Sequence, residues 1–88
     1  SLSSIEGMAS GKPFIASNVP GLSDVVAGAG ILFECGNEKQ LAQHIQELLN
    51  DPLHYQKTAT ACQERAQEYT IEKMVAAHIE LYELINNS

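Results

Sequence analysis

The sequence predicts an α/β fold in which short parallel strands are followed by three helices. Three observations support this class: two short apolar runs between breakers at 14–16 and 31–33, helical spacing before and between them, and wholly helical patterning after residue 36. Strands that alternate with helices imply right-handed crossovers and a parallel sheet. Two strands are too few for a complete sheet, so we expect the chain to form the last part of a Rossmann-like domain.

The first half of the chain predicts a helix, a strand, a second helix and a second strand. Apolar residues recur at helical spacing from Leu2 to Ala9, and Gly11 and Pro13 then end the helix. Residues 14–16 form an apolar run typical of a strand buried on both faces. Residues 18–21 predict a turn, residues 22–26 a short helix, and residues 31–33 the second strand.

The second half predicts three amphipathic helices, each with its own cap. Asn37 begins the first in a capping-box arrangement with Gln40, Asp51 and Pro52 begin the second, and Thr70 begins the third. Their expected buried stripes are, in order, Leu41, Ala42, Ile45, Leu48 and Leu49; Tyr55, Ala59, Cys62, Ala66 and Tyr69; and Ile71, Met74, Val75, His78, Ile79, Tyr82 and Ile85.

Composition excludes several classes of function. The formal net charge of −6, with only five Lys and Arg residues, argues against nucleic acid as a partner. No apolar run approaches the roughly 20 residues that span a bilayer, and we expect a soluble protein without a transmembrane segment. Cys35 and Cys62 lack metal-like or redox-like spacing, so free thiols in a reducing compartment are expected. No two histidines lie one helical turn apart, and no metal site is predicted.

Three segments resemble the C-terminal nucleotide-sugar domain of retaining glycosyltransferases of the GT-B fold, the family 4 type (glycosyl transferases group 1). Residues 5–17, IEGMASGKPFIAS, resemble the end of the family motif E-G-F-G-L-x-x-L-E-A-M-A-x-G-x-P-V-I-A-S, and Ser1 and Leu2 match its G-L. Residues 20–26 resemble G-G-L-x-E-V-V, and residues 28–33 resemble G-x-G-x-L-V. Gly7 and Asp24 are mild departures. The first glutamate of the family's paired motif would lie two positions before Ser1.

The resemblance implies a site built around the first helix. Glu6 would accept hydrogen bonds from the ribose hydroxyls of a nucleotide-diphosphate sugar, the backbone at Ser1 and Leu2 would meet the diphosphate, and Ile5 would lie near the nucleoside. No catalytic residue is assignable among the 88, and no cofactor or metal is expected. Since ligands of such sheets bind beyond the strands' carboxyl ends, residues 17–21 and 34–36 should lie on the ligand side. There, turn residues such as Asn18 are more often expected to bond their own backbone than a ligand.

The resemblance also implies a domain organisation. Residues 1–88 would be the C-terminal part of a donor-binding domain whose upstream strands and helices, and whose N-terminal acceptor domain, are absent. The last helix would then lack its usual cover, which favours self-association, and the 88 residues alone would be inactive. The parent enzyme, a hexosyltransferase of polysaccharide or glycolipid assembly, would be cytoplasmic, with peripheral membrane attachment as an option.

Two alternatives from other classes stay open. A small α/β interaction module of the receiver type would need an acidic pocket at the strand ends, where only Glu34 directly follows a strand. An acyl carrier protein would need serine in an Asp-Ser-Leu setting at the start of a helix. The nearest match, Leu22-Ser23-Asp24, has the reverse order.

Overall fold

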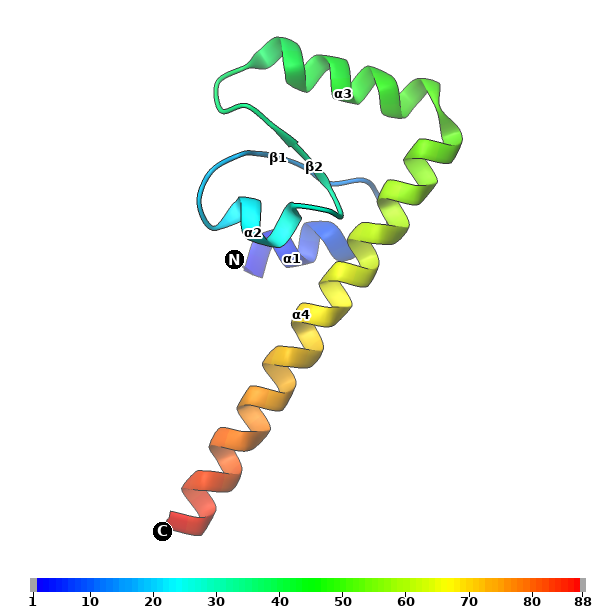
Figure 1. Ribbon diagram of the computed structural model, residues 1–88. Coiled ribbons are helices and arrows are strands. Elements are labelled where there is room, and N and C mark those ends of the chain that lie inside the picture. Colours follow the sequence, from blue (N-terminus) through cyan, green and yellow to red (C-terminus); the bar gives the residue numbers. More distant parts are fainter. Residues whose placement is uncertain (1, 88) are drawn as a thin grey trace.

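The computed structural model alternates helices and strands in its first half and is helical in its second (Figure 1). It describes the backbone of residues 2–87 and the side chains of residues 4–76 and 79. The elements are α1 (Leu2–Ala9), β1 (Ile15–Ser17), α2 (Leu22–Val26), β2 (Ile31–Phe33), α3 (Glu38–Asn50) and α4 (Pro52–Asn87). The predicted α/β class is therefore confirmed.

The two strands are parallel neighbours, as predicted. Ile15 pairs with Ile31 and Ser17 pairs with Phe33. The ladder extends past both ends of β1, because the Ile31 N–H donates to the Phe14 carbonyl at 2.9 Å and the Asn18 N–H donates to the Phe33 carbonyl at 2.8 Å. The first strand begins one residue later than predicted, a difference within the ordinary uncertainty of strand ends.

The core lies where α1, α2 and the strands meet the first half of α4. Met8, Val26 and Cys62 are fully buried, and Ala16 and Ala66 are nearly so. Small residues dominate the face of α4 that packs here, which allows that helix to approach the sheet and α1 closely. Residues 59, 62 and 66 are buried and Tyr55 and Tyr69 are half-buried, so the predicted inner face of this helix is confirmed.

Arg65 connects α4 to the end of α2 by two hydrogen bonds. Its Nη1 donates to the carbonyl of Val25 at 3.0 Å and to that of Ala27 at 2.9 Å. The last carbonyls of a helix have no partner within the helix, and a cationic side chain near them is favourable. The same guanidinium lies 3.7 Å from the carboxylate of Glu68.

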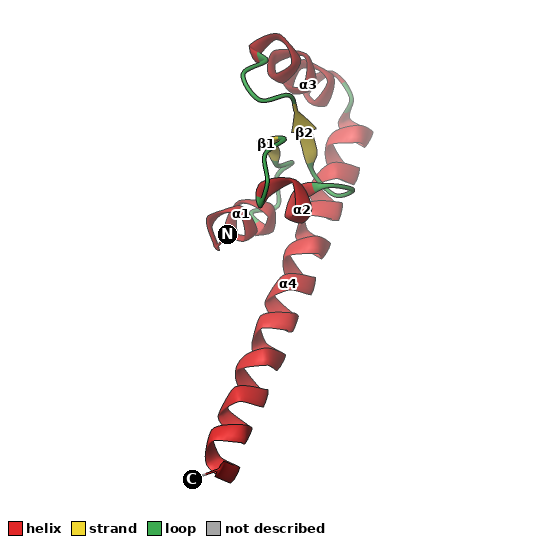
Figure 2. Ribbon diagram, turned by 60° about the vertical axis from the view of Figure 1, so that its left-hand side comes forward, coloured by secondary structure: helices red, strands yellow, loops and turns green. Residues whose placement is uncertain are grey.

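The prediction of a third helix beginning at Thr70 is wrong. A single helix runs from Pro52 to Asn87, and its second half extends away from the rest of the molecule (Figures 1 and 2). The Thr70 hydroxyl does not cap a helix: it donates to the carbonyl of Ala66, one turn earlier, at 2.9 Å. This bond occurs within a continuing helix, because a Thr hydroxyl can reach the carbonyl four residues before it.

Two predicted apolar stripes are more exposed than expected. On α3 only Leu48 is buried, whereas Ala42, Ile45 and Leu49 are exposed. On the second half of α4, the exposed fractions of Ile71, Met74, Val75 and Ile79 are 61%, 57%, 53% and 53%. The side chains of His78, Tyr82 and Ile85 lie outside the described residues. The predicted burial of this stripe is therefore not found for its described residues, and the missing cover of the last helix stays a prediction.

Candidate functional site

Glu6 occupies an exposed position on α1. Its helix is anchored by Ser4 and Met8, which are both buried, and by Ile5, which packs partly buried against the core. These neighbours fix the rotation of α1, so that Glu6 faces outward. Within the described side chains, the ion pairs join His44 to Glu47 and Arg65 to Glu68, and neither involves Glu6. Its carboxylate is thus available to a ligand.

The beginning of α1 lies on the same side of the molecule as the carboxyl ends of both strands (Figure 1). Leu2 is the first residue of the helix, and the first turn carries no acidic side chain. The first N–H groups of a helix have no partner within it and carry partial positive charge. Ser1 and the side chain of Leu2 lie outside the described residues. The predicted backbone contacts of Ser1 and Leu2 with a diphosphate stay predictions.

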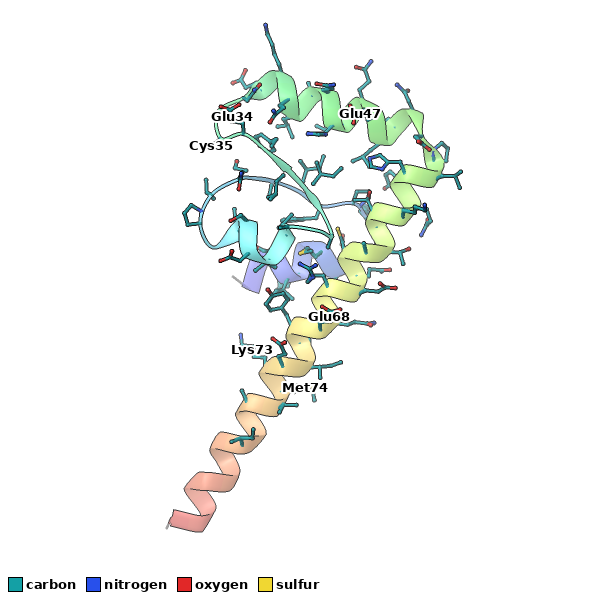
Figure 3. All side chains as sticks on the ribbon, in the orientation of Figure 1. Glu34, Cys35, Glu47, Glu68, Lys73 and Met74 are labelled. Atoms are coloured by element: carbon teal, nitrogen blue, oxygen red, sulfur yellow. The ribbon has the colours of Figure 1, made fainter. Side chains whose placement is uncertain are left out.

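A hollow lies at the carboxyl ends of the two strands, and we call it the strand-end hollow. Its volume is about 500 Å³, and the residues that line it are Asn18, Leu32, Phe33, Glu34, Cys35 and Gln40. Glu34 and Cys35 follow β2 directly, in the loop that leads to α3 (Figure 3). Since β1 and β2 are parallel neighbours, segments 17–21 and 34–36 leave the sheet at the same edge, and Asn18, Glu34 and Cys35 line the hollow there.

Hydrogen bonds within the loop from β2 to α3 hold the wall of this hollow in place. The Gln40 Oε1 accepts from the Glu34 N–H, and the Asn37 N–H donates to the Glu34 carbonyl at 2.9 Å. The Asn37 Oδ1 accepts from the Gln40 N–H at 3.0 Å, which confirms the predicted cap. The reciprocal bond expected of a capping box goes instead to Glu34, because the Asn37 N–H already has a partner.

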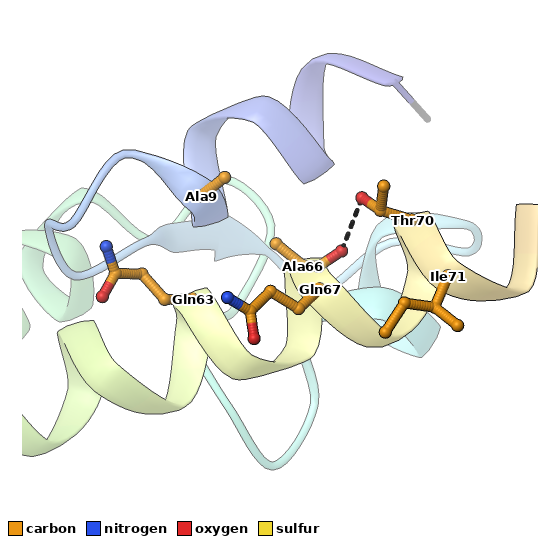
Figure 4. A pocket seen from close by; sticks show the side chains of 6 residues that line it. All are labelled: Ala9, Gln63, Ala66, Gln67, Thr70 and Ile71. Atoms are coloured by element: carbon orange, nitrogen blue, oxygen red, sulfur yellow. Dashed lines mark hydrogen bonds between the residues drawn. The ribbon is translucent and has the colours of Figure 1, made fainter. Parts of the chain in front are cut away.

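A second hollow, of about 330 Å³, lies between the end of α1 and the middle of α4 (Figure 4). The residues that line it are Ala9, Gln63, Ala66, Gln67, Thr70 and Ile71. The sequence does not indicate this hollow. Nothing in the local pattern could have indicated it, because its walls come from helices that are more than fifty residues apart in the chain.

The cysteines and histidines do not form a metal site in the described part of the chain. Cys35 is an exposed free thiol and Cys62 a buried one, which confirms the expected free thiols. Burial raises the pKa of the Cys62 thiol, against the smaller opposing effects of the Phe14 backbone and the Arg65 charge. Among the described residues, no three His, Cys, Asp or Glu side chains are grouped to hold a metal ion. None of the described helices has the length and apolar character needed to cross a membrane.

Comparison with known proteins identifies a family. The model of the family "Glycosyl transferases group 1" matches residues 1–69. A protein of Methanocaldococcus jannaschii described as an uncharacterized glycosyltransferase is 32% identical over 85 residues, which cover 94% of this chain and 24% of that protein. The chain thus spans about a quarter of the length of this curated relative. No solved structure matches. The family match includes α1, both strands and the strand-end hollow, and this chain belongs to the glycosyl transferases group 1 family.

Proposed function

We propose that the protein is a retaining glycosyltransferase of the family 4 type, with a GT-B fold. It transfers a sugar from a nucleotide-diphosphate donor to an acceptor, and residues 1–88 form the C-terminal part of its donor-binding domain. The family match and the parallel sheet support this assignment. The curated relative, named a glycosyltransferase and about four times as long as the aligned segment, supports a parent protein with further domains.

Glu6 binds the donor through its ribose. The observation that carries this role is the exposed carboxylate on a helix whose first turn lies on the same side of the molecule as the carboxyl ends of the strands. A ribose offers two neighbouring hydroxyl donors, and one carboxylate can accept both in charge-assisted bonds. The backbone N–H groups of Ser1 and Leu2 meet the diphosphate, and Ile5, half-buried beside Glu6, lies near the nucleoside.

The proposed chemistry depends on a preorganised pocket. The enzyme holds the acceptor close to the donor sugar and stabilises the departing diphosphate by charge and hydrogen bonds. No residue of 1–88 is assigned as catalytic, and no cofactor or metal is invoked. We place the hexosyl transfer in polysaccharide or glycolipid assembly in the cytoplasm, with peripheral contact to a membrane as one arrangement.

The role of Glu6 is tested by Glu6→Gln in the full-length protein. This change keeps the shape of the side chain and removes its charge, so we expect a loss of roughly 1–3 kcal/mol in donor binding or transition-state stabilisation. Steady-state kinetics with UDP-sugar and GDP-sugar donors measure it. Glu64→Gln, an exposed carboxylate on α4, is the matched control and should change nothing. Donor kinetics that are unchanged in Glu6→Gln would reject the assignment.

The 88 residues alone should show no transferase activity and at most weak nucleotide binding. The reason is that the proposed donor site needs upstream residues to face Glu6, and the acceptor needs a second domain. Titration of UDP-glucose into the 88-residue chain, followed by amide chemical shifts, checks this expectation. Turnover, or tight saturable binding centred far from Glu6, contradicts it.

A further inference from the structure

We propose that the strand-end hollow binds an uncharged sugar ring by its hydroxyl groups, with Glu34 as the principal acceptor. This proposal rests on the function proposed above and deepens it. It adds a second binding position, built from the loops after β1 and β2 instead of from α1. The hollow of about 500 Å³ is within the usual size range of small-molecule sites.

The polar groups that line the hollow suit hydroxyl groups. The Glu34 carboxylate is exposed, and its Oε2 lies 3.4 Å from the Asn37 Nδ2, a long bond that leaves most of its accepting capacity unused. The Gln40 Oε1 is engaged by the Glu34 N–H, so its Nε2 remains as a donor. The Asn18 side chain is exposed and can both donate and accept. A sugar hydroxyl, itself donor and acceptor, can pair with all three.

Charge selects among the possible ligands. No lysine or arginine is among the residues that line this hollow, and its one charged side chain is negative. A phosphate or carboxylate ligand would therefore be repelled by Glu34 without a compensating cation. A neutral ring with several hydroxyl groups meets a carboxylate that accepts strong, charge-assisted bonds and two amides that supply donors.

The backbone that carries these groups is also held in position before a ligand arrives. The Glu34 backbone is fixed at its N–H by Gln40 and at its carbonyl by Asn37, while Asn18 follows a strand whose ladder extends into it through the Phe33 carbonyl. A site whose groups are already ordered loses less conformational entropy when a ligand binds. The hollow is thus formed by the ends of two adjacent parallel strands, the residues that follow them and Gln40 of α3, at the end of the sheet where ligands of such folds bind.

The test is a saturation-transfer NMR titration of the full-length protein with methyl α-D-glucopyranoside, methyl α-D-mannopyranoside and methyl N-acetyl-α-D-glucosaminide. At least one glycoside should bind, and Glu34→Gln should weaken that binding by about tenfold, the effect of losing one charge-assisted hydrogen bond. Asn18→Ala should weaken it to a smaller extent. Glu64→Gln is the matched control. Unchanged binding in Glu34→Gln, or preferential binding of inorganic phosphate, would overturn the proposal.

Kinetics of the same variants identify the source of the sugar. A raised KM for the acceptor in Glu34→Gln places the acceptor's sugar in the hollow, and a raised KM for the donor places the donor's sugar there. Either result supports the site, whereas a Glu34→Gln enzyme with both KM values unchanged counts against it. If the glycosides bind through Glu34 but the protein transfers no sugar, the proposed function fails and the binding site stands.

Discussion

Gly30 occupies a position just before β2 where no side chain fits. A Cβ at this residue would lie 2.6 Å from the Phe14 carbonyl oxygen and 2.9 Å from the Val26 Cγ1. The same carbonyl accepts from the Ile31 N–H, the bond that extends the ladder beyond the strands. The backbone cannot move away without loss of that bond. The alignment of the two strands therefore depends on a residue without a side chain at position 30.

We expect Gly30→Ala to destabilise the protein by about 1–3 kcal/mol, the usual cost of overpacking in a core. Urea unfolding followed by circular dichroism measures this loss. Gln43→Ala, a change at an exposed position of α3, is the control and should leave the midpoint nearly unchanged. Equal midpoints for Gly30→Ala and the unmodified protein would show that the Phe14 carbonyl is free to move.

Hydrogen bonds between residues that are close in the sequence could be predicted. Asn37 and Asp51 were identified as caps because their side chains need only reach N–H groups two or three residues ahead, and both do so. The exposure of Glu6 and the reach of Arg65 could not be predicted in this way. The bonds of Arg65 span about forty residues of chain, and no local pattern encodes them.

Among the elements, the sequence predicted the ends of most helices and strands, but it did not predict that one helix continues through Thr70. Gly11 and Pro13 ended α1 as expected, because both residues interfere with helical backbone. Thr70 is a good capping residue, which favours a break, but no glycine or proline accompanies it and good helix formers lie one turn to either side of it. The helix therefore continues. For the strand-end hollow, the sequence predicted only the side of the sheet on which it lies. Its shape depends on how close Asn18 and Gln40 lie to each other in the folded chain.

Asp51→Ala should destabilise the start of α4. The Asp51 Oδ1 accepts from the N–H groups of Leu53 and His54, both at 3.1 Å, and loss of such a cap costs about 1 kcal/mol. The free energy of unfolding in urea measures the effect, and Asp51→Ser should restore most of it because serine also caps helices. If Asp51→Ser were as unstable as Asp51→Ala, the role of Asp51 would lie elsewhere than in the cap.

The whole molecule is elongated. Its longest dimension is 57 Å and its radius of gyration is 16.3 Å, whereas a compact chain of this length has a radius of about 12 Å. The difference comes from α4, whose second half stands clear of the body (Figure 2). An uncovered apolar helix face of this kind favours self-association, which stays a prediction for this chain.

Polar substitution should lower the free energy of unfolding in the first half of α4 and leave it nearly unchanged in the second half. We expect Ile71→Gln with Val75→Gln to leave the free energy of unfolding within about 0.5 kcal/mol, because both side chains are more than half exposed. The pair should also reduce binding of the dye ANS and any concentration-dependent sedimentation. Ala66→Gln, on the buried face, should destabilise strongly. A double variant as unstable as Ala66→Gln would mean that the end of α4 packs against the body.

The two hydrogen bonds of Arg65 also bear on the order in which the chain can fold. They join positions 40 and 38 residues apart, so the entropy of closing a long loop must be lost before they form. We expect helices α3 and α4 to form early from local contacts and the attachment of α4 to α2 to form later, because its partners are far apart in the sequence. If the Arg65 bonds form late, their loss should speed unfolding more than it slows folding, which stopped-flow kinetics of Arg65→Gln would measure.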